Sequence, residues 1–179
     1  LSNAIKKVDI GRVNNNYFLN VCSAGLLSDV AYETDTNMKN TLGKLAYYIK
    51  GIEKIPKFTP FKIRLKYDSN VIEDNFLLLL ILNGSSAGGF NRLAPNAKID
   101  DGLLDIVAVK NTNITNILAL FLKILRGEHI GDPNLYSFQT DRLGITCEGG
   151  CETDIDGERG PGFPLDIEVK KHFLKVFVP

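Results

Sequence analysis

Residues 61–82 read FKIRLKYDSNVIEDNFLLLLIL and contain two strand patterns separated by a turn. In residues 61–68 apolar and charged side chains alternate, which is the period of a half-buried strand. Asp68-Ser69-Asn70 then supplies turn-forming residues. The returning segment ends in the apolar run 76–82, which has no polar face. This stretch therefore predicts an antiparallel hairpin whose second strand is central and covered on both sides.

Similar patterns recur on both sides of this hairpin. They predict further strands over residues 8–11, 17–22, 103–109, 136–140, 143–147, 165–170 and 173–178. Short strands at this spacing predict a mainly β fold, an antiparallel β-sandwich or distorted barrel. We expect one domain over residues 1–179, because the sequence shows no internal repeat and no low-complexity linker.

Two helical insertions are expected to interrupt the sheet. The first covers residues 26–55 and is stopped by Pro56. The second begins at Asn113 or Thr115 as N-cap, runs to Arg126 and ends at Gly127. Apolar residues cover much of the second helix, so it is expected to pack on the sheet, with membrane contact as an open alternative.

Composition excludes some classes of protein. The 21 basic and 21 acidic residues cancel, which argues against a nucleic-acid partner. Three cysteines leave one thiol without a partner, which favours a reducing cytoplasm over a disulfide-stabilised fold. No apolar run approaches the ~20 residues of a membrane-spanning helix. The basic stretch 39–66 leaves peripheral membrane association open.

Familiar catalytic motifs are missing from the sequence. It contains no G-x-x-x-x-G-K-[ST] loop and no G-x-G-x-x-G fingerprint. Neither of the two histidines lies near a nucleophile in an order that suggests a hydrolytic triad. The sequence therefore contains no motif that indicates nucleotide binding or hydrolytic catalysis.

Three local features remain as candidate sites. Asn83-Gly84-Ser85-Ser86-Ala87-Gly88-Gly89-Phe90 is a small-residue loop that permits close backbone approach by a ligand. The Asp100-Asp101-Gly102 turn places a carboxylate where it could bind a hard cation such as Mg²⁺. Asp154-Ile155-Asp156-Gly157-Glu158 gathers three carboxylates, one of which could accept a hydroxyl proton. Each feature also has a purely structural explanation. The small-residue loop could be a plain connection, the Asp-Asp-Gly turn could only start the next strand, and the acidic segment could be a solvated hairpin.

Together these features resemble the C-terminal domain of the diacylglycerol kinase family, in its bacterial lipid kinase branch. The matching segments are Tyr17-Phe18-Leu19-Asn20-Val21 with Gly25 and Asp29-Val30, Asn83-Gly84 with Gly88-Gly89-Phe90, Ala94-Pro95-x-Ala97, Asp101-Gly102-x-Leu104-Asp105, Asp156-Gly157-Glu158 and residues 174–179. The resemblance implies the second domain of the NAD kinase/diacylglycerol kinase-like fold. That domain is the lipid-acceptor half of an enzyme that moves the ATP γ-phosphate to a lipid hydroxyl, usually of diacylglycerol.

The resemblance also implies roles for individual residues. Glu158 matches the family's general base, and Asp101 matches the side-chain ligand of a structural Mg²⁺. The backbone carbonyls of Lys98 and Leu103 fall at the other two ligand positions. The matching substrate-loop residues are Asn83, Gly84, Gly88, Gly89 and Asp156. Ala87 stands where many members have a third glycine, which leaves the shape of the loop open.

The implied cofactors are Mg²⁺ and ATP, with ATP bound mainly by the family's N-terminal domain. The nucleotide motif of that domain, Gly-Gly-Asp-Gly-Thr, does not occur in this sequence, so the chain alone is expected to be inactive. The expected partners are this N-terminal domain and a lipid substrate at a membrane surface, with a homodimer as an open alternative. Another acceptor, such as a sphingoid base, and a non-catalytic lipid-binding module are alternative functions.

Overall fold

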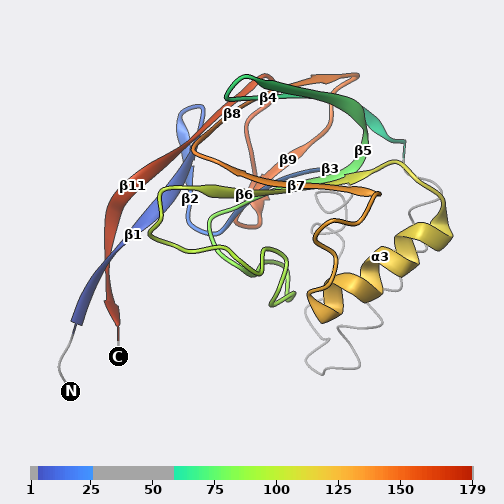
Figure 1. The fold of residues 1–179 in the computed structure, drawn as a ribbon. Helices are drawn as coiled ribbons and strands as arrows, with labels where there is room; N and C mark the ends of the chain where they lie inside the picture. The colour runs from blue at the N-terminus through green and yellow to red at the C-terminus, as the bar shows by residue number, and fades with distance from the viewer. Residues whose placement is uncertain (1–3, 26–58, 179) are drawn as a thin grey trace.

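The computed structural model describes residues 4–25 and 59–178, and Figure 1 shows their arrangement. Most of these residues lie in antiparallel strands. The strands are β1 (Ala4–Val13), β2 (Asn16–Phe18), β3 (Val21–Gly25), β4 (Phe61–Tyr67), β5 (Asn70–Leu82), β6 (Leu104–Lys110), β7 (Leu135–Thr140), β8 (Arg142–Glu148), β9 (Thr153–Ile155), β10 (Glu158–Arg159) and β11 (Leu165–Val178). The predicted mainly β, antiparallel fold is confirmed.

Within the described residues the strands form one 11-stranded, curled sheet. Its path is β10-β9-β3-β5-β4-β8-β11-β1-β2, and β6 and β7 branch from β5. The first half of β5 pairs with β4, and the second half lies between β3 and β6. The predicted hairpin over residues 61–82 is therefore present, and its second strand is central.

The apolar run 76–82 serves two separate cores, which explains why it lacks a polar face. Phe76, Leu79 and Ile81 belong to a main core inside the curled sheet. Leu80 and Leu82 face the other way into a second core, which residues from the Gly-rich loop and the helix also fill. Burial of both faces of this strand, predicted from the sequence, is confirmed.

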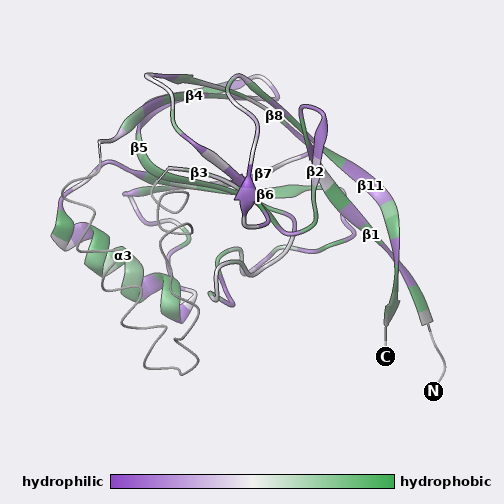
Figure 2. Ribbon diagram, turned by 180° about the vertical axis from the view of Figure 1, so that it is seen from behind, coloured by the Kyte–Doolittle hydropathy of each residue, from purple (hydrophilic) through white to green (hydrophobic). Residues whose placement is uncertain are grey.

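The helix α3 (Ile114–Arg126) covers this second core. Asn113 is its N-cap, and its Oδ1 accepts a hydrogen bond from Asn116 N at 2.9 Å. Gly127 ends the helix in the left-handed conformation, with φ of 75°. Figure 2 shows hydrophobic residues along much of its length. The second predicted helix is thus confirmed, whereas the first, residues 26–55, lies outside the described residues.

Two predictions are wrong in the continuity of strands. Residues 165–170 and 173–178 were expected to form separate strands, but both belong to the single strand β11. Residues 17–22 were expected to form a single strand, but they belong to β2 and β3, which are separated at Leu19 and Asn20. The break allows the backbone N–H groups of this turn to bind a carboxylate instead of a neighbouring strand. No helix in the part of the chain that the structure describes is long and apolar enough to cross a membrane.

Candidate functional site

The acidic segment forms a tight β-hairpin at the edge of the sheet. Its strands are β9 and β10, paired through Glu158 opposite Ile155. Asp156 and Gly157 both have positive φ, 51° and 95°, which is the type I′ turn favoured by Asp-Gly between two strands. The side chain of Glu158 is exposed to solvent directly after this turn. The hairpin therefore presents one exposed carboxylate, which has no partner among the described residues, from a short, defined turn.

Asp156 fixes this hairpin to the β2–β3 turn. Its carboxylate accepts hydrogen bonds from the backbone N–H groups of Leu19, Asn20 and Val21, at 2.6, 3.0 and 2.8 Å. Its own N–H donates to Val21 O at 2.9 Å. Three N–H donors on one carboxylate form a charge-assisted cluster. Asp156 therefore positions the turn that carries Glu158.

Asp154 is the buried member of the acidic segment. Its Oδ1 accepts a hydrogen bond from Gly157 N at 2.9 Å, which closes the turn. Its Oδ2 is buried and has no hydrogen-bond partner among the described residues. Burial raises the pKa of Asp154 above its ordinary value, the Gly157 N–H opposes this, and the nearby charge of Asp156 adds to it. The three carboxylates thus have three different environments.

Asn83 joins the start of the Gly-rich loop to the same β2–β3 turn. Its buried Nδ2 donates to Leu19 O at 3.0 Å and to Asp9 O at 2.9 Å. Its backbone N–H donates to Asn20 O at 2.9 Å. These two carbonyl acceptors assign the orientation of the amide, which leaves Oδ1 buried without a partner in the described residues.

The rest of the Gly-rich loop packs onto the second core. Ala87 and Phe90 exchange backbone hydrogen bonds across Gly88 and Gly89, which have φ of 57° and 87°. The side chain of Ala87 is buried in the second core. A Cβ atom added at Gly84 would lie 3.7 Å from Ile99 Cγ2, so the loop approaches the Asp-Gly turn. The first part of the loop therefore belongs to the site, whereas Ala87 contributes to packing.

Asp9 is the residue that sequence reasoning missed. Its side chain is 1% exposed, and its carboxylate accepts hydrogen bonds from Gly102 N at 2.7 Å and His172 N at 2.6 Å. Its own N–H donates to Ile99 O at 2.7 Å. The register between β1 and β11 shifts at this point, where His172 has φ of 52°. A single Asp between Val8 and Ile10 was the only sequence signal.

The buried Asp9 therefore holds the Asp-Gly turn through the N–H of Gly102. Gly102 has φ of 76°, and Asp101 Oδ1 accepts a hydrogen bond from Leu103 N at 3.0 Å. The side chains of Asp101 and Lys98 are exposed. One exposed carboxylate in a tight turn, with backbone carbonyls next to it, fits the oxygen ligands that Mg²⁺ prefers. The described residues contain no cluster of three or more His, Cys, Asp or Glu side chains that could hold a metal ion, so a cation at this turn would depend on backbone carbonyl oxygens beside Asp101.

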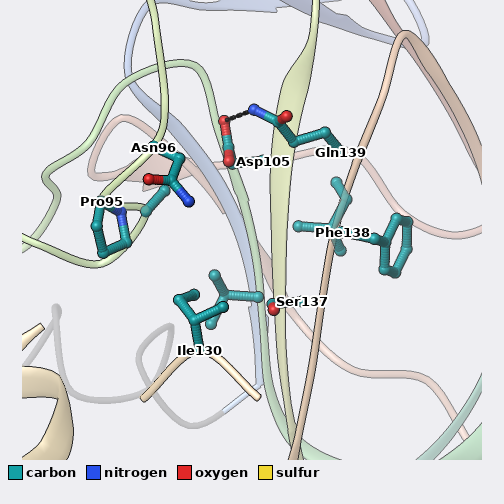
Figure 3. A pocket seen from close by; sticks show the side chains of 10 residues that line it. Pro95, Asn96, Asp105, Ile130, Ser137, Phe138 and Gln139 are labelled. Atoms are coloured by element: carbon teal, nitrogen blue, oxygen red, sulfur yellow. Dashed lines mark hydrogen bonds between the residues drawn. The ribbon is translucent and has the colours of Figure 1, made fainter. Parts of the chain in front are cut away.

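A small cavity lies between the 94–96 loop, Ile130 and strands β6 and β7. Figure 3 shows Asp105 and Gln139 at one end of it, joined by a 3.2 Å hydrogen bond, with Asn96 opposite. Burial raises the pKa of Asp105; the Gln139 amide opposes this and the charge of Asp101 adds to it. The volume, about 220 Å³, is below the ~300–1,000 Å³ usual for drug-sized ligands. The cavity is therefore too small to hold a diacyl lipid.

The three segments singled out in the sequence thus meet around one structural centre. The β2–β3 turn binds the acidic hairpin through Asp156 and the Gly-rich loop through Asn83. Asp9 then connects Asn83 to the Asp-Gly turn. Lys98, Asp101, Leu103 and Gly84 lie in this region, whereas Gly88 lies on the far part of the loop, where a Cβ atom would meet nothing within 4 Å.

Comparison with known proteins confirms the family resemblance seen in the sequence. The family model described as the YegS C-terminal NAD kinase beta sandwich-like domain matches residues 20–178. A diacylglycerol kinase of Bacillus subtilis (strain 168) is 32% identical over 179 residues, which are 100% of this chain and 59% of that protein. A diacylglycerol kinase of Staphylococcus epidermidis (strain ATCC 12228 / FDA PCI 1200) is 34% identical over 97% of this chain and 55% of its own length.

The fold is also similar to solved structures. A crystal structure of a proposed diacylglycerol kinase from Bacillus anthracis str. Sterne matches with a TM-score of 0.77 and 30% identity. The match covers 98% of this chain and 57% of that one. The chain thus spans a little over half the length of the relatives it matches. It belongs to the bacterial diacylglycerol kinase family, through the domain described as the YegS C-terminal NAD kinase beta sandwich-like domain.

Proposed function

We propose that this chain forms the lipid-acceptor part of an ATP-dependent kinase that converts diacylglycerol to phosphatidic acid. The observation that carries the proposal is the position of Glu158. Its carboxylate is exposed, on a hairpin that Asp156 holds with three hydrogen bonds. A general base needs this combination of an accessible oxygen and a fixed backbone.

In the proposed reaction the lipid hydroxyl oxygen attacks the γ-phosphorus of ATP. A bond forms between the hydroxyl oxygen and phosphorus, the bond to the ADP oxygen breaks, and Glu158 accepts the hydroxyl proton. Because Glu158 is exposed in this chain, contact with an ATP-binding domain has to exclude water from the carboxylate. Asp154 and Asp156 shape the hairpin and do not take the proton.

Mg²⁺ and ATP are the proposed cofactors, with ATP bound mainly outside this chain. Lys98, Asp101 and Leu103 would hold the cation through two carbonyl oxygens and one carboxylate. A bound Mg²⁺ would supply positive charge that stiffens the Asp-Gly turn. The remaining contacts of this turn, from Asp9 to Gly102 N and from Asp101 to Leu103 N, are made by the chain itself.

The decisive experiment uses the full-length enzyme with Glu158→Gln, which preserves shape and removes the basic oxygen. Transfer of radiolabelled phosphate to diacylglycerol in vesicles should fall by about 10²- to 10⁴-fold, the usual contribution of a general base. ATP binding should be unchanged, because the variant does not touch the nucleotide. The matched control is Glu128→Gln, at another exposed glutamate, which lies just after the end of α3. This variant should retain full activity.

Near-normal turnover in Glu158→Gln would overturn the assignment of the base. The 179-residue chain alone should transfer no phosphate. Detectable transfer by it would overturn the proposal that ATP is bound mainly by a separate domain. Replacing diacylglycerol with a sphingoid base or a soluble polyol in the same assay tests the acceptor class.

A non-catalytic lipid-binding module is the second candidate. It is favoured by the outer side of α3, where Ile114, Leu118, Leu122 and Leu125 are 40–54% exposed in the described structure. Such apolar side chains next to the basic Arg126 suit an anionic membrane surface, whereas Lys123 is paired with Asp132 at 2.7 Å. Sedimentation with phosphatidylserine vesicles and the transfer assay separate the two: binding without transfer by the full-length protein selects the module.

A further inference from the structure

Cys147 and Cys151 form a dithiol that the proposed kinase chemistry does not use. Their sulfur atoms lie 3.7 Å apart, and both thiols are free. Cys147 is near the end of β8, and Cys151 lies in the connection to β9. Both side chains are half-buried against the main core. They are therefore close to each other and still reachable from solvent.

The backbone between the two cysteines brings their side chains together. Gly149 and Gly150 have φ of 86° and 72°, a conformation that other residues adopt only with strain. A Cβ atom at either glycine would meet nothing within 4 Å, so backbone conformation and not lack of space requires glycine there. The turn therefore reverses the chain within three residues and places Cys151 beside Cys147.

We propose that Cys147 and Cys151 are a site of reversible oxidation, which small disulfides such as oxidised glutathione convert to an intramolecular disulfide. One cysteine sulfur attacks the small disulfide, forms a mixed disulfide and releases the first thiol. The second cysteine sulfur then attacks the first, forms the internal bond and releases the second thiol. Two cysteine thiols and one small disulfide thus give one protein disulfide and two small thiols.

The environments of the three thiols decide which of them react. Burial, and then the neighbouring Cys147, raise the pKa of Cys151. Attack on the small disulfide starts at either member of the pair, and the other sulfur, 3.7 Å away, resolves the mixed disulfide. The third thiol, Cys22, is fully buried, and burial followed by the charges of Asp154 and Asp156 raises its pKa to about 12. Oxidation is consequently confined to the pair.

The disulfide would form within the connection between β8 and the acidic hairpin β9–β10. Only Glu152 separates Cys151 from β9, which carries Asp154 and leads to Glu158. β9 is held on one side by β3 and on the other by the two residues of β10. A disulfide would restrain the residues that enter β9 at Thr153, whether or not the chain acts in a kinase.

Trypsin makes the test direct, because Leu143–Arg159 is one tryptic segment that contains both cysteines and excludes Cys22. The folded chain is treated with excess oxidised glutathione, alkylated, digested and weighed by mass spectrometry. We expect this peptide to lose two hydrogen atoms and carry neither alkyl group nor glutathione, and dithiothreitol to restore both thiols. Its reaction should be at least about 100-fold faster than modification of Cys22, as expected for half-buried thiols compared with a fully buried one.

Single-cysteine variants separate the proposed route from simple glutathione attachment. Cys147→Ser and Cys151→Ser should each prevent the internal bond and retain one glutathione on the remaining cysteine of the pair. Cys22→Ser should behave as the native chain does. Two separate glutathione adducts on the native peptide, a disulfide formed only between molecules, or modification of Cys22 at the same rate would each overturn the proposal.

Discussion

Asp9 and Asp156 use the same chemistry in two different regions of the molecule. Each carboxylate gathers backbone N–H groups from segments distant in sequence: Asp9 from Gly102 and His172, and Asp156 from residues 19–21. Asp9 is buried between the β1–β11 ribbon and the Asp-Gly turn, whereas Asp156 is exposed on a hairpin at the sheet edge. One anchors a turn from inside the fold, and the other from its surface.

The difference shows that the number of hydrogen bonds does not decide how much a carboxylate stabilises a fold. When a buried acceptor is removed, its donors remain unsatisfied in a place that water does not reach. When an exposed acceptor is removed, water replaces much of what is lost. Asp9 with two bonds should therefore matter more for folding than Asp156 with three.

Asp9→Ala should have the largest effect on stability. The N–H groups of Gly102 and His172 lose their acceptor at a site that is 1% exposed. At about 1–3 kcal/mol for each buried unsatisfied donor, we expect a loss of about 3 kcal/mol in the free energy of unfolding. Urea denaturation of the chain followed by circular dichroism measures it, and a loss below about 1 kcal/mol would show that water reaches the site.

Asp156→Ala should cost less stability but disturb the site more directly. We expect a loss of about 1–2 kcal/mol, because solvent replaces part of the three hydrogen bonds from residues 19–21. Amide hydrogen exchange in residues 19–21 should accelerate, while exchange at Gly102 should stay as it is. Asp156→Asn, which keeps one acceptor oxygen and tolerates positive φ, is the control. Its free energy of unfolding should lie between those of the native chain and Asp156→Ala. A loss larger than that of Asp9→Ala would reverse the comparison.

Asp154→Asn should change the pH dependence of stability more than stability itself. Burial raises the pKa of Asp154 in the folded state above the ordinary value of 3.8, so the folded chain binds this proton more tightly than the unfolded chain. Stability from this group is therefore complete below pH 3.8 and is lost as the pH rises through the folded pKa.

The asparagine variant keeps an oxygen for the Gly157 N–H and should remove this decline. Urea denaturation at a series of pH values, starting at about 3.5 and passing above the ordinary carboxylate pKa, measures how the free energy of unfolding changes with pH. A variant whose free energy of unfolding falls with pH as steeply as that of the native chain would show that Asp154 does not titrate in this range.

Glu158→Gln should have the smallest effect on folding. The side chain is exposed and its strand pairing to Ile155 involves only the backbone. The free energy of unfolding should stay within ~0.5 kcal/mol of the native value, as for most surface substitutions. Together with lost transfer in the full-length enzyme, this would assign Glu158 to chemistry and Asp9 and Asp156 to structure. A clear loss of stability would place Glu158 with the anchoring residues.

Much of the fold could be predicted from local sequence pattern. Alternation in residues 61–67 and the apolar run 76–82 predicted the central hairpin, and the Asn113 and Gly127 caps predicted α3 to within a residue. The short strands β9 and β10 were not predicted as strands, because segments of two or three residues leave no periodicity to detect. The division of residues 17–22 was missed because Leu19 and Asn20 carry no strong turn signal.

The candidate site was predicted only in its loops. Glu158, Asp101 and the Gly-rich loop were identified from their residue types and their order, which also carry the resemblance to the family. The side chains that hold these loops together were not. Asn83 was expected to lie in a substrate loop, and the structure shows its amide bonded to Asp9 O and Leu19 O inside the fold.

The sequence by itself therefore determined the longer strands, the caps of α3 and the Asp-Gly turns, because these depend on side chains within a few residues of one another. Only the tertiary structure decided that Asp9 meets Gly102 and that Asp156 meets residues 19–21. These partners are separated by 93 and up to 137 positions, so no local pattern records them. A carboxylate binds whichever N–H groups the completed sheet brings within reach, and that proximity exists only after the chain has folded.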